Sequence, residues 1–127
     1  MKEPNTQERR KLRRQNLAYY MQVINGISME KMGHLVDLSI SGLMIDTLQA
    51  LPIGRDYRLR VETTPEVADK ASIEFTARTR WCKNDRMEPY LYNVGFEIIS
   101  ITAHDTDIIQ RIMDKYGARS NTSLGRF

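Results

Sequence analysis

Apolar and polar residues alternate along much of the chain, which is the pattern of strands that bury one face. The alternation is clearest over residues 57–62 and 73–81, and it recurs over 91–99. A period of two predicts half-buried strands. Three more strands are predicted from apolar residues over 17–24, 35–38 and 43–45. Glycine, proline and polar residues between these six segments predict turns.

The period changes to that of a helix near residue 102. Thr102–Asp105 resembles a capping box with aspartate as its fourth member, and Gly117 suits the position just past a helix end. Between them, apolar residues follow helical spacing at Ile108, Ile109, Ile112, Met113 and Tyr116. We therefore predict one helix over 103–116. Six strands and a terminal helix favour an all-β fold, a small antiparallel barrel whose helix covers an open end or face.

Four residues in the predicted strands and turns raise specific expectations. Gly26 and Gly33 are expected to bracket the first turn. Gly95 lies inside the last strand and predicts a bulge or a close backbone approach. Trp81 falls at a strand end, where a core or rim position is favoured over a base-stacking role.

Composition indicates one folded domain with a charged arm. The chain has 127 residues and a net charge of +3, yet five of its 19 basic residues lie between Arg9 and Arg14. Residues 1–14 carry no apolar period and are predicted to form an exposed arm. Residues 15–117 are expected to form the domain, and residues 118–127 a loose tail.

Several function classes are disfavoured by what the chain contains. Cys82 is its one cysteine, so no intrachain disulfide and no cysteine zinc site is expected. No metal-ligand spacing surrounds His34 or His104, and no nucleophile–base signature is recognisable, so neither a metal cofactor nor catalysis is expected. No apolar run approaches the ~20 residues of a membrane helix, and no signal-peptide pattern is present, so a cytoplasmic protein is expected.

The arginine run Glu8–Arg14 is the first candidate binding feature. Guanidinium groups bind phosphate oxygens bidentately and stack on base planes. Arg10 and Arg14 are four residues apart, as are Arg9 and Arg13, and that offset spans about 13 Å on an extended chain. This suits a ligand with two phosphates and two purines better than a lone phosphate. The simpler interpretation is a solvated arm that attracts anions without specificity.

The turn Asp37–Gly42 is the second candidate feature. It offers a carboxylate at Asp37, a hydroxyl at Ser39 and, at Gly42, a residue that lets a ligand approach the backbone. Taken alone, it is an ordinary hairpin connection in which Asp37 and Ser39 bond their own backbone.

Together these two motifs resemble those of the PilZ domain family, the bacterial receptors for cyclic di-GMP. Arg10 and Arg14 match the family's R-x-x-x-R motif, and Asp37, Ser39 and Gly42 match its D-x-S-x-x-G motif. The resemblance covers roughly residues 8–117. It implies a six-stranded antiparallel barrel with a C-terminal helix, and an arm that folds over the ligand against the barrel.

The resemblance also implies roles for the motif residues. Arg10 and Arg14 would contact phosphates and guanine faces. Asp37 and Ser39 would contact a guanine edge or its neighbours, and Gly42 would shape the turn. An ionised aspartate accepts hydrogen bonds only, which suits the donor edge of guanine.

Arg9 directly precedes the matching pair. In related domains an arginine there is associated with binding a stacked pair of cyclic di-GMP molecules, sometimes across a dimer. Lys11 and Arg13 are interpreted as supporting charge, although they leave the arginine register open between Arg10 with Arg14 and Arg9 with Arg13.

The function expected from this resemblance is a receptor for cyclic di-GMP that orders its arm on binding and signals through a partner protein or a homodimer. One alternative is a small barrel that binds nucleic acid, which the lack of a clustered aromatic platform disfavours. The other is a protein-interaction module that keeps the fold without the ligand.

Overall fold

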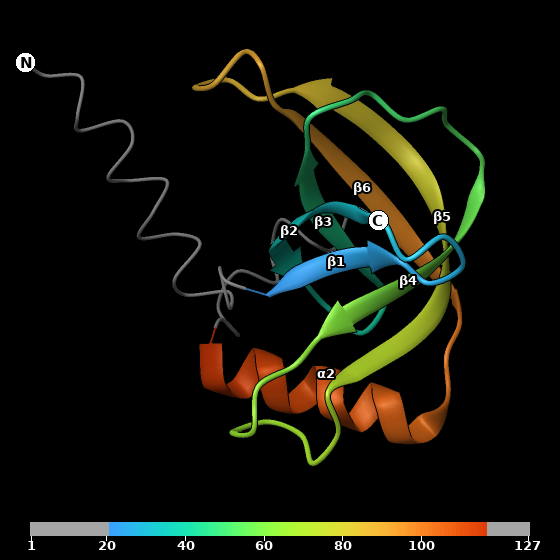
Figure 1. Ribbon diagram of the computed structural model, residues 1–127, viewed down its shortest axis with the longest axis vertical. Helices are drawn as coiled ribbons and strands as arrows, with labels where there is room; N and C mark the ends of the chain where they lie inside the picture. Colours follow the sequence, from blue (N-terminus) through green and yellow to red (C-terminus); the bar gives the residue numbers. More distant parts are fainter. Residues whose placement is uncertain (1–20, 117–127) are drawn as a thin grey trace, which may run out of the picture.

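The chain folds into a closed barrel of six antiparallel strands, as a computed structural model that describes residues 21–116 shows (Figure 1). The strands follow the order β1-β2-β3-β6-β5-β4 around the barrel. They are β1 (Gln22–Asn25), β2 (Lys31–Leu38), β3 (Gly42–Thr47), β4 (Asp56–Glu62), β5 (Ser72–Asn84) and β6 (Tyr92–Ser100), and helix α2 (Ala103–Tyr116) follows them. The predicted all-β barrel with a terminal helix is confirmed.

The core lies inside the barrel and follows the predicted alternation. In β4 and β5 every second residue from Leu59 to Val61 and from Ile73 to Ala77 is buried. Tyr57 packs edge-to-face on Phe96, with 6.0 Å between the ring centroids and 85° between the ring planes. Burying an aliphatic or aromatic side chain of this kind contributes about 1.5–3 kcal/mol, so these strands bring much of the folding energy.

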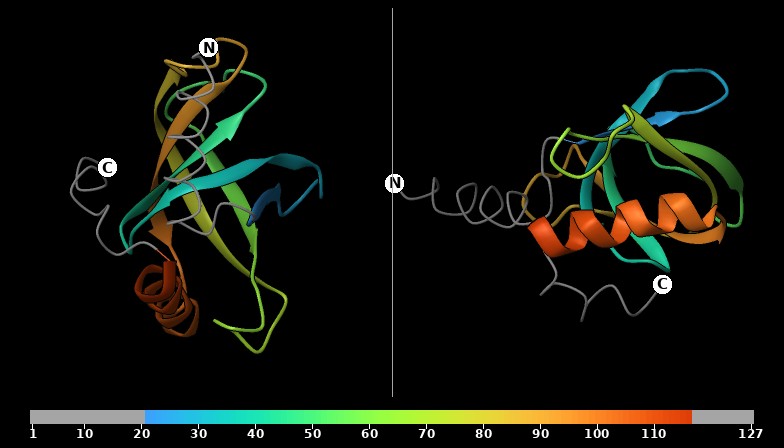
Figure 2. Two further views of the ribbon diagram at one scale, coloured as in Figure 1. Left: turned by 90° about the vertical axis from the view of Figure 1, so that its left-hand side faces the viewer. Right: turned by 90° about the horizontal axis from the view of Figure 1, so that it is seen from below.

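Helix α2 closes one end of the barrel (Figures 1 and 2). Its first turn is capped as predicted, because Thr102 Oγ1 accepts the N–H of Asp105 at 3.1 Å. Ile108, Ile109 and Ile112 are buried in the same apolar cluster as the strands. The helix therefore supplies the apolar surface that this end of the barrel lacks.

The buried carboxylate of Asp105 links α2 to the sheet. Asp105 is 4% exposed, and one of its oxygens lies 2.6 Å from Lys70 Nζ. The other oxygen accepts the backbone N–H of Glu74 at 3.2 Å. A charge so enclosed must be paired and hydrogen-bonded to be tolerated, and here both conditions are met.

Because neighbouring strands are antiparallel, the connections between consecutive strands lie alternately at the two ends of the barrel. The helix end carries the start of β1, the β2–β3 turn (39–41), the β4–β5 loop (63–71) and α2. The opposite end, here named the loop end, carries the connections 26–30, 48–55 and 85–91. Consecutive antiparallel strands run in opposite directions, so their connections must alternate in this way.

Two predicted boundaries differ from the structure. Gly33 lies within β2 and does not close the first turn, because β2 begins at Lys31. A Cβ on Gly33 would stand 1.7 Å from the backbone oxygen of Asp46, so this glycine serves a close approach of two strands. Strand β5 continues past Trp81 to Asn84.

Part of the predicted first strand, residues 17–20, lies outside the described residues, as do the predicted arm and tail. In the part of the chain from 21 to 116, no helix has the length and apolar character to cross a membrane.

Candidate functional site

The β2–β3 turn is held by its own hydrogen bonds. The N–H of Ser39 donates to the carbonyl of Gly42 at 2.8 Å. Ser39 Oγ accepts the N–H groups of Ser41 and Gly42, both at 3.2 Å. The carbonyl of Ser41 accepts the N–H of Ile98 at 2.9 Å, which attaches the turn to β6. The interpretation that Ser39 bonds its own backbone is confirmed, and the turn is consequently well fixed.

Asp37 belongs to β2 and not to the turn itself. It is 7% exposed and pairs with Met44 of β3, next to a register shift between Leu35 and Asp37. Met44 stands between the core residues Leu43 and Ile45, so strand alternation places it on the outer face of the barrel. Asp37 lies opposite it, on that same outer face.

Four strands bring Asp37 into line with a tryptophan. Asp37 pairs with Met44, Met44 pairs with Gly95 of β6, and Gly95 pairs with Trp81 of β5. We name these four residues the central row. At about 4.8 Å between neighbouring strands, the row extends about 14 Å from its first backbone to its last.

The indole of Trp81 lies on the outer face, over Gly95. Val94 and Phe96 are fully buried, so a Cβ on Gly95 would point outward. That Cβ would stand 2.2 Å from Trp81 Cε2, in space that the ring occupies. Lys83 Nζ lies 5.4 Å from the centroid of the ring, within the range of a cation–π contact.

The close approach expected at Gly95 is therefore confirmed, and the ring that makes the approach is Trp81. A core or rim position was favoured for this tryptophan from the sequence. Gly95 pairs with Trp81 across two neighbouring strands. A glycine opposite a tryptophan was the signal that could have placed the ring on the outer face.

A row of ion pairs borders the central row on the side of the turn. Arg78 Nε lies 2.7 Å from Asp56 Oδ1, and Arg80 Nη1 lies 3.4 Å from Glu97 Oε1. The hydrogen bond from Arg78 holds the pKa of Asp56 below its ordinary value. Arg78 is half-buried and Arg80 is exposed, and each is matched by a carboxylate.

The border on the other side of the central row is also polar. It crosses β2, β3, β6 and β5 through His34, Asp46, Asn93 and Lys83. The backbone N–H of His34 donates to Asp46 Oδ1 at 3.1 Å. Across residues 21–116, no group of three histidine, cysteine, aspartate or glutamate side chains could hold a metal ion.

The start of β1 lies beside Asp37. The carbonyl of Met21 accepts the N–H of Leu35 at 3.0 Å, two residues before Asp37 in β2. Arg9, Arg10 and Arg14 themselves lie outside the described residues. Six residues separate Arg14 from Met21, and the seven steps from one Cα to the other span at most about 25 Å. The central row is within this reach.

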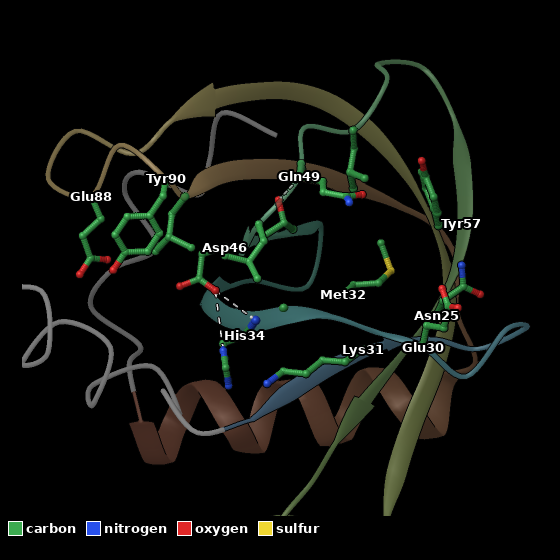
Figure 3. Close-up of a pocket in the computed structure, with 15 residues that line it drawn as sticks. Asn25, Glu30, Lys31, Met32, His34, Asp46, Gln49, Tyr57, Glu88 and Tyr90 are labelled. Atoms are coloured by element: carbon green, nitrogen blue, oxygen red, sulfur yellow. Dashed lines mark hydrogen bonds and ion pairs between the residues drawn. The ribbon is translucent and has the colours of Figure 1, made fainter.

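A pocket of about 750 Å³ shares His34 and Asp46 with this second border and extends toward the loop end (Figure 3). Figure 3 shows Glu88 and Tyr90 at one side of it, Asn25, Glu30 and Tyr57 at the other, and Asp46 between them. None of Asp37, Ser39 and Gly42 lines this pocket. Asp37 and the turn that follows it therefore lie outside this pocket.

Comparisons with known proteins agree with this fold and with the two motifs. A model of the PilZ domain matches residues 7–115, a range that contains both motifs. A solved structure of the Bacillus subtilis inhibitor of motility (MotI/DgrA) is 17% identical, with a TM-score of 0.58, over 78% of this chain and 47% of that one. The chain spans about half the length of that structure, and the likeness shows a shared fold. No curated protein matches the chain.

Proposed function

The chain belongs to the PilZ domain family, and we propose that it is a receptor which binds cyclic di-GMP along the central row, beneath its N-terminal arm. The observation that carries the proposal is the alignment of Asp37 with the indole of Trp81 on one outer face, beside the start of β1.

Asp37 is the proposed anchor for one guanine. Asp37 lies on the outer face at one end of the central row, and an ionised carboxylate accepts hydrogen bonds only. The N–H edge of guanine supplies donors. Ser39 and Gly42 support this contact by fixing the turn that follows Asp37.

Trp81 is the proposed platform for the far part of the ligand. Its ring lies on the outer face at the opposite end of the central row from Asp37. Stacking of a base on an aromatic side chain is worth about 1–3 kcal/mol. A ligand with two purines has the length to contact both ends of a row of about 14 Å.

The arm supplies the phosphate contacts in this proposal. Arg78 and Arg80 on the barrel face are already paired with carboxylates. Arg10 and Arg14 reach the row from Met21 and bind phosphate oxygens bidentately. Arg9 adds contacts to a second, stacked ligand molecule.

Ordering of the arm is the proposed signal. Fixing about seven backbone residues costs roughly 1–2 kcal/mol each, so several charge-assisted contacts are needed to offset it. The ordered arm then changes the surface that a partner protein, or a second copy of the chain, meets at the helix end.

Calorimetry with cyclic di-GMP tests the receptor proposal. We expect near-stoichiometric binding to the wild type and at least tenfold weaker binding to Arg10→Ala and Asp37→Ala. Absence of heat with the wild type would overturn the proposal, and unchanged affinity in Arg10→Ala would overturn the residue assignment. Single-stranded RNA and DNA are titrated in parallel. Tighter binding of these, with a steep salt dependence, would favour a nucleic-acid-binding barrel.

A further inference from the structure

Strand β5 extends past the start of β4, its neighbour on one side (Figure 1). The pairing of β4 with β5 ends at Asp56 and Arg78. Residues 81–84 continue to pair with β6, but no strand in the described part of the chain pairs with their other side. We name residues 80–84 the free edge of β5.

Two residues of the free edge point backbone groups to its open side. Thr79 is buried on the core side, and its N–H and C=O bond away from β6, to Arg55 and Gly54. In a strand of L-residues, the face that carries the side chain fixes the side to which the backbone groups point. Cys82 also packs on the core, and alternation places Asn84 on the same face. Their N–H and C=O groups therefore face the open side, where no hydrogen bond within residues 21–116 satisfies them.

Three basic side chains surround the free edge. Arg55 lies at its start, because its carbonyl accepts the N–H of Thr79 at 3.0 Å, and Arg86 follows its end by two residues. Lys83 lies on the edge itself, with its ammonium group over the ring of Trp81. All three basic residues are exposed, and none forms an ion pair with another described residue.

The carboxylates next to these arginines in the chain already have partners. Asp56, which follows Arg55, accepts two hydrogen bonds from Arg78. Asp85, which precedes Arg86, is buried and accepts two N–H groups of the loop that follows it. The free edge is therefore a positive site whose charge is not balanced by these neighbours.

We propose that the free edge of β5 binds an extended acidic segment of a partner protein, which adds to the barrel as a further strand. The backbone of the segment exchanges hydrogen bonds with Cys82 and Asn84, as strand addition requires. Its carboxylates pair with Arg55, Lys83 and Arg86 through charge-assisted contacts.

Two other occupants fit these observations less well. A second copy of the chain would bring the same three cations to the same edge, and like charges of this kind protect strand edges from pairing with themselves. Nucleic acid phosphates would neutralise the cations, but they are hydrogen-bond acceptors and leave the carbonyls of Cys82 and Asn84 without donors.

This inference deepens the proposed function, since it gives the chemistry of the partner through which a PilZ receptor would signal, and its biological role rests on that function. Trp81 belongs to the free edge, so the bound dinucleotide and the bound segment would be neighbours on one strand. The proposed contacts of the segment involve none of Asp37, Ser39 and Gly42. Peptide binding and dinucleotide binding can therefore be measured separately.

Two synthetic peptides of nine residues test the inference. Both alternate threonine with a charged residue, and they differ only in whether that residue is glutamate or lysine. Amide shifts and hydrogen exchange of the ¹⁵N-labelled full chain are followed during titration, with and without cyclic di-GMP. We expect the glutamate peptide to bind at least tenfold more tightly than the lysine peptide. It should shift amides in 53–56 and 80–86, and slow the exchange of the Cys82 and Asn84 amides at least tenfold.

Two substitutions of Asn84 separate strand addition from attraction between charges. Asn84 is exposed at the end of β5, where proline is tolerated and removes the N–H that faces the open side. Alanine keeps this N–H and is the matched control. We expect at least fivefold weaker binding of the glutamate peptide to Asn84→Pro, and binding within twofold of the wild type to Asn84→Ala.

Substitution of the two arginines tests the charge. In Arg55→Gln/Arg86→Gln the preference for the glutamate peptide should fall to about threefold or less, because the charge-assisted contacts are lost. Lys31→Gln/Lys115→Gln removes the same charge from exposed residues of β2 and α2 and should leave the preference unchanged.

Equal binding of the two peptides would overturn the inference, and so would unchanged exchange at Cys82 and Asn84 or equal effects of proline and alanine at residue 84. A wild-type dimer that Asn84→Pro disperses would assign the free edge to a second copy instead. Tighter binding of single-stranded DNA at the same amides would assign it to nucleic acid.

The two proposals fail in different ways. Peptide binding without dinucleotide binding would overturn the proposed function and leave the strand-addition site standing. Dinucleotide binding without peptide binding would overturn this inference alone.

Discussion

The indole of Trp81 occupies the space in which a Cβ of residue 95 would stand, 2.2 Å from its Cε2 atom. The contact joins β5 to β6 on the outer face of the barrel, where the strands also carry a register shift between Thr79 and Trp81. A glycine at this point lets a large ring lie against the strand. The position of the proposed stacking platform therefore depends on Gly95.

Gly95→Ala should displace this ring. We expect a loss of about 1–3 kcal/mol in the free energy of unfolding, as for other overpacked sites, and weaker cyclic di-GMP binding with altered tryptophan fluorescence. Urea unfolding and calorimetry measure the two effects. The double variant Gly95→Ala/Trp81→Ala should recover stability without recovering affinity. Full recovery of affinity would show that the ring does not contact the ligand.

Gly33→Ala should be more damaging. Its Cβ would meet the backbone oxygen of Asp46 at 1.7 Å, and backbone atoms in a paired strand cannot move aside as a flexible side chain can. We expect destabilisation of about 3 kcal/mol or more. A urea midpoint equal to that of the wild type would contradict this close approach of β2 and β3.

Ser39→Ala removes the acceptor of two backbone N–H groups in the β2–β3 turn. Leaving such groups without a partner costs about 1–3 kcal/mol. We also expect weaker cyclic di-GMP binding, because the turn fixes Asp37. Ser41→Ala is the matched control: its backbone carbonyl keeps the bond to Ile98, so both effects should be smaller. Equal effects of the two substitutions would contradict the role assigned to Ser39.

The affinity and stoichiometry of cyclic di-GMP binding to arginine variants distinguish the two arginine registers. If Arg10 and Arg14 hold the ligand, their alanine variants should lose affinity at least tenfold, whereas Arg13→Ala should lose threefold or less. Arg9→Ala should lower the number of cyclic di-GMP molecules bound per chain from two towards one. Calorimetry gives both quantities. A larger loss in Arg9→Ala and Arg13→Ala than in the other pair would establish the alternative register.

The C-terminal end of α2 should respond to pH. Tyr116 donates its hydroxyl hydrogen bond to Glu66 of the β4–β5 loop. This bond lowers the pKa of Glu66 from its ordinary value of 4.5 and raises the pKa of Tyr116 from 10.0. The carboxylate contribution is thus complete above pH 4.5 and is lost as the pH falls through the lowered pKa. The tyrosine contribution is complete below pH 10.0 and is lost as the pH rises through the raised pKa.

Tyr116→Phe tests this coupling. The stability difference between wild type and variant should be small, because Glu66 is exposed and Tyr116 is only half-buried. It should be constant between about pH 5 and 9. It should shrink below pH 4.5 and above pH 10. Urea unfolding across this range measures it. A difference that does not change with pH would show that the hydrogen bond contributes nothing.

Local features of the chain were sufficient for its elements. The alternation of Leu59 with Val61 and of Ile73 with Phe75 predicted half-buried strands, because side chains of a strand alternate between its faces whatever it pairs with. A helix was predicted over about 103–116 and spans Ala103–Tyr116, since its cap at Thr102 and its apolar stripe are both local. The two motifs likewise pointed to the family from a few neighbouring residues.

Only the tertiary structure decided which residues share a surface. Asp37 and Trp81 align because of the way β2, β3, β6 and β5 pair, including the register shifts in β2 and β5. A slip of one residue in this pairing would turn a side chain to the other face of the sheet. The same barrel closure gathers Ile27, Leu48 and Tyr90 at the loop end, although each belongs to a different connection. Gly33 could be a turn or a close contact until Asp46 was placed beside it. Propensity and period act over a few residues, whereas a binding surface depends on the pairing of distant strands.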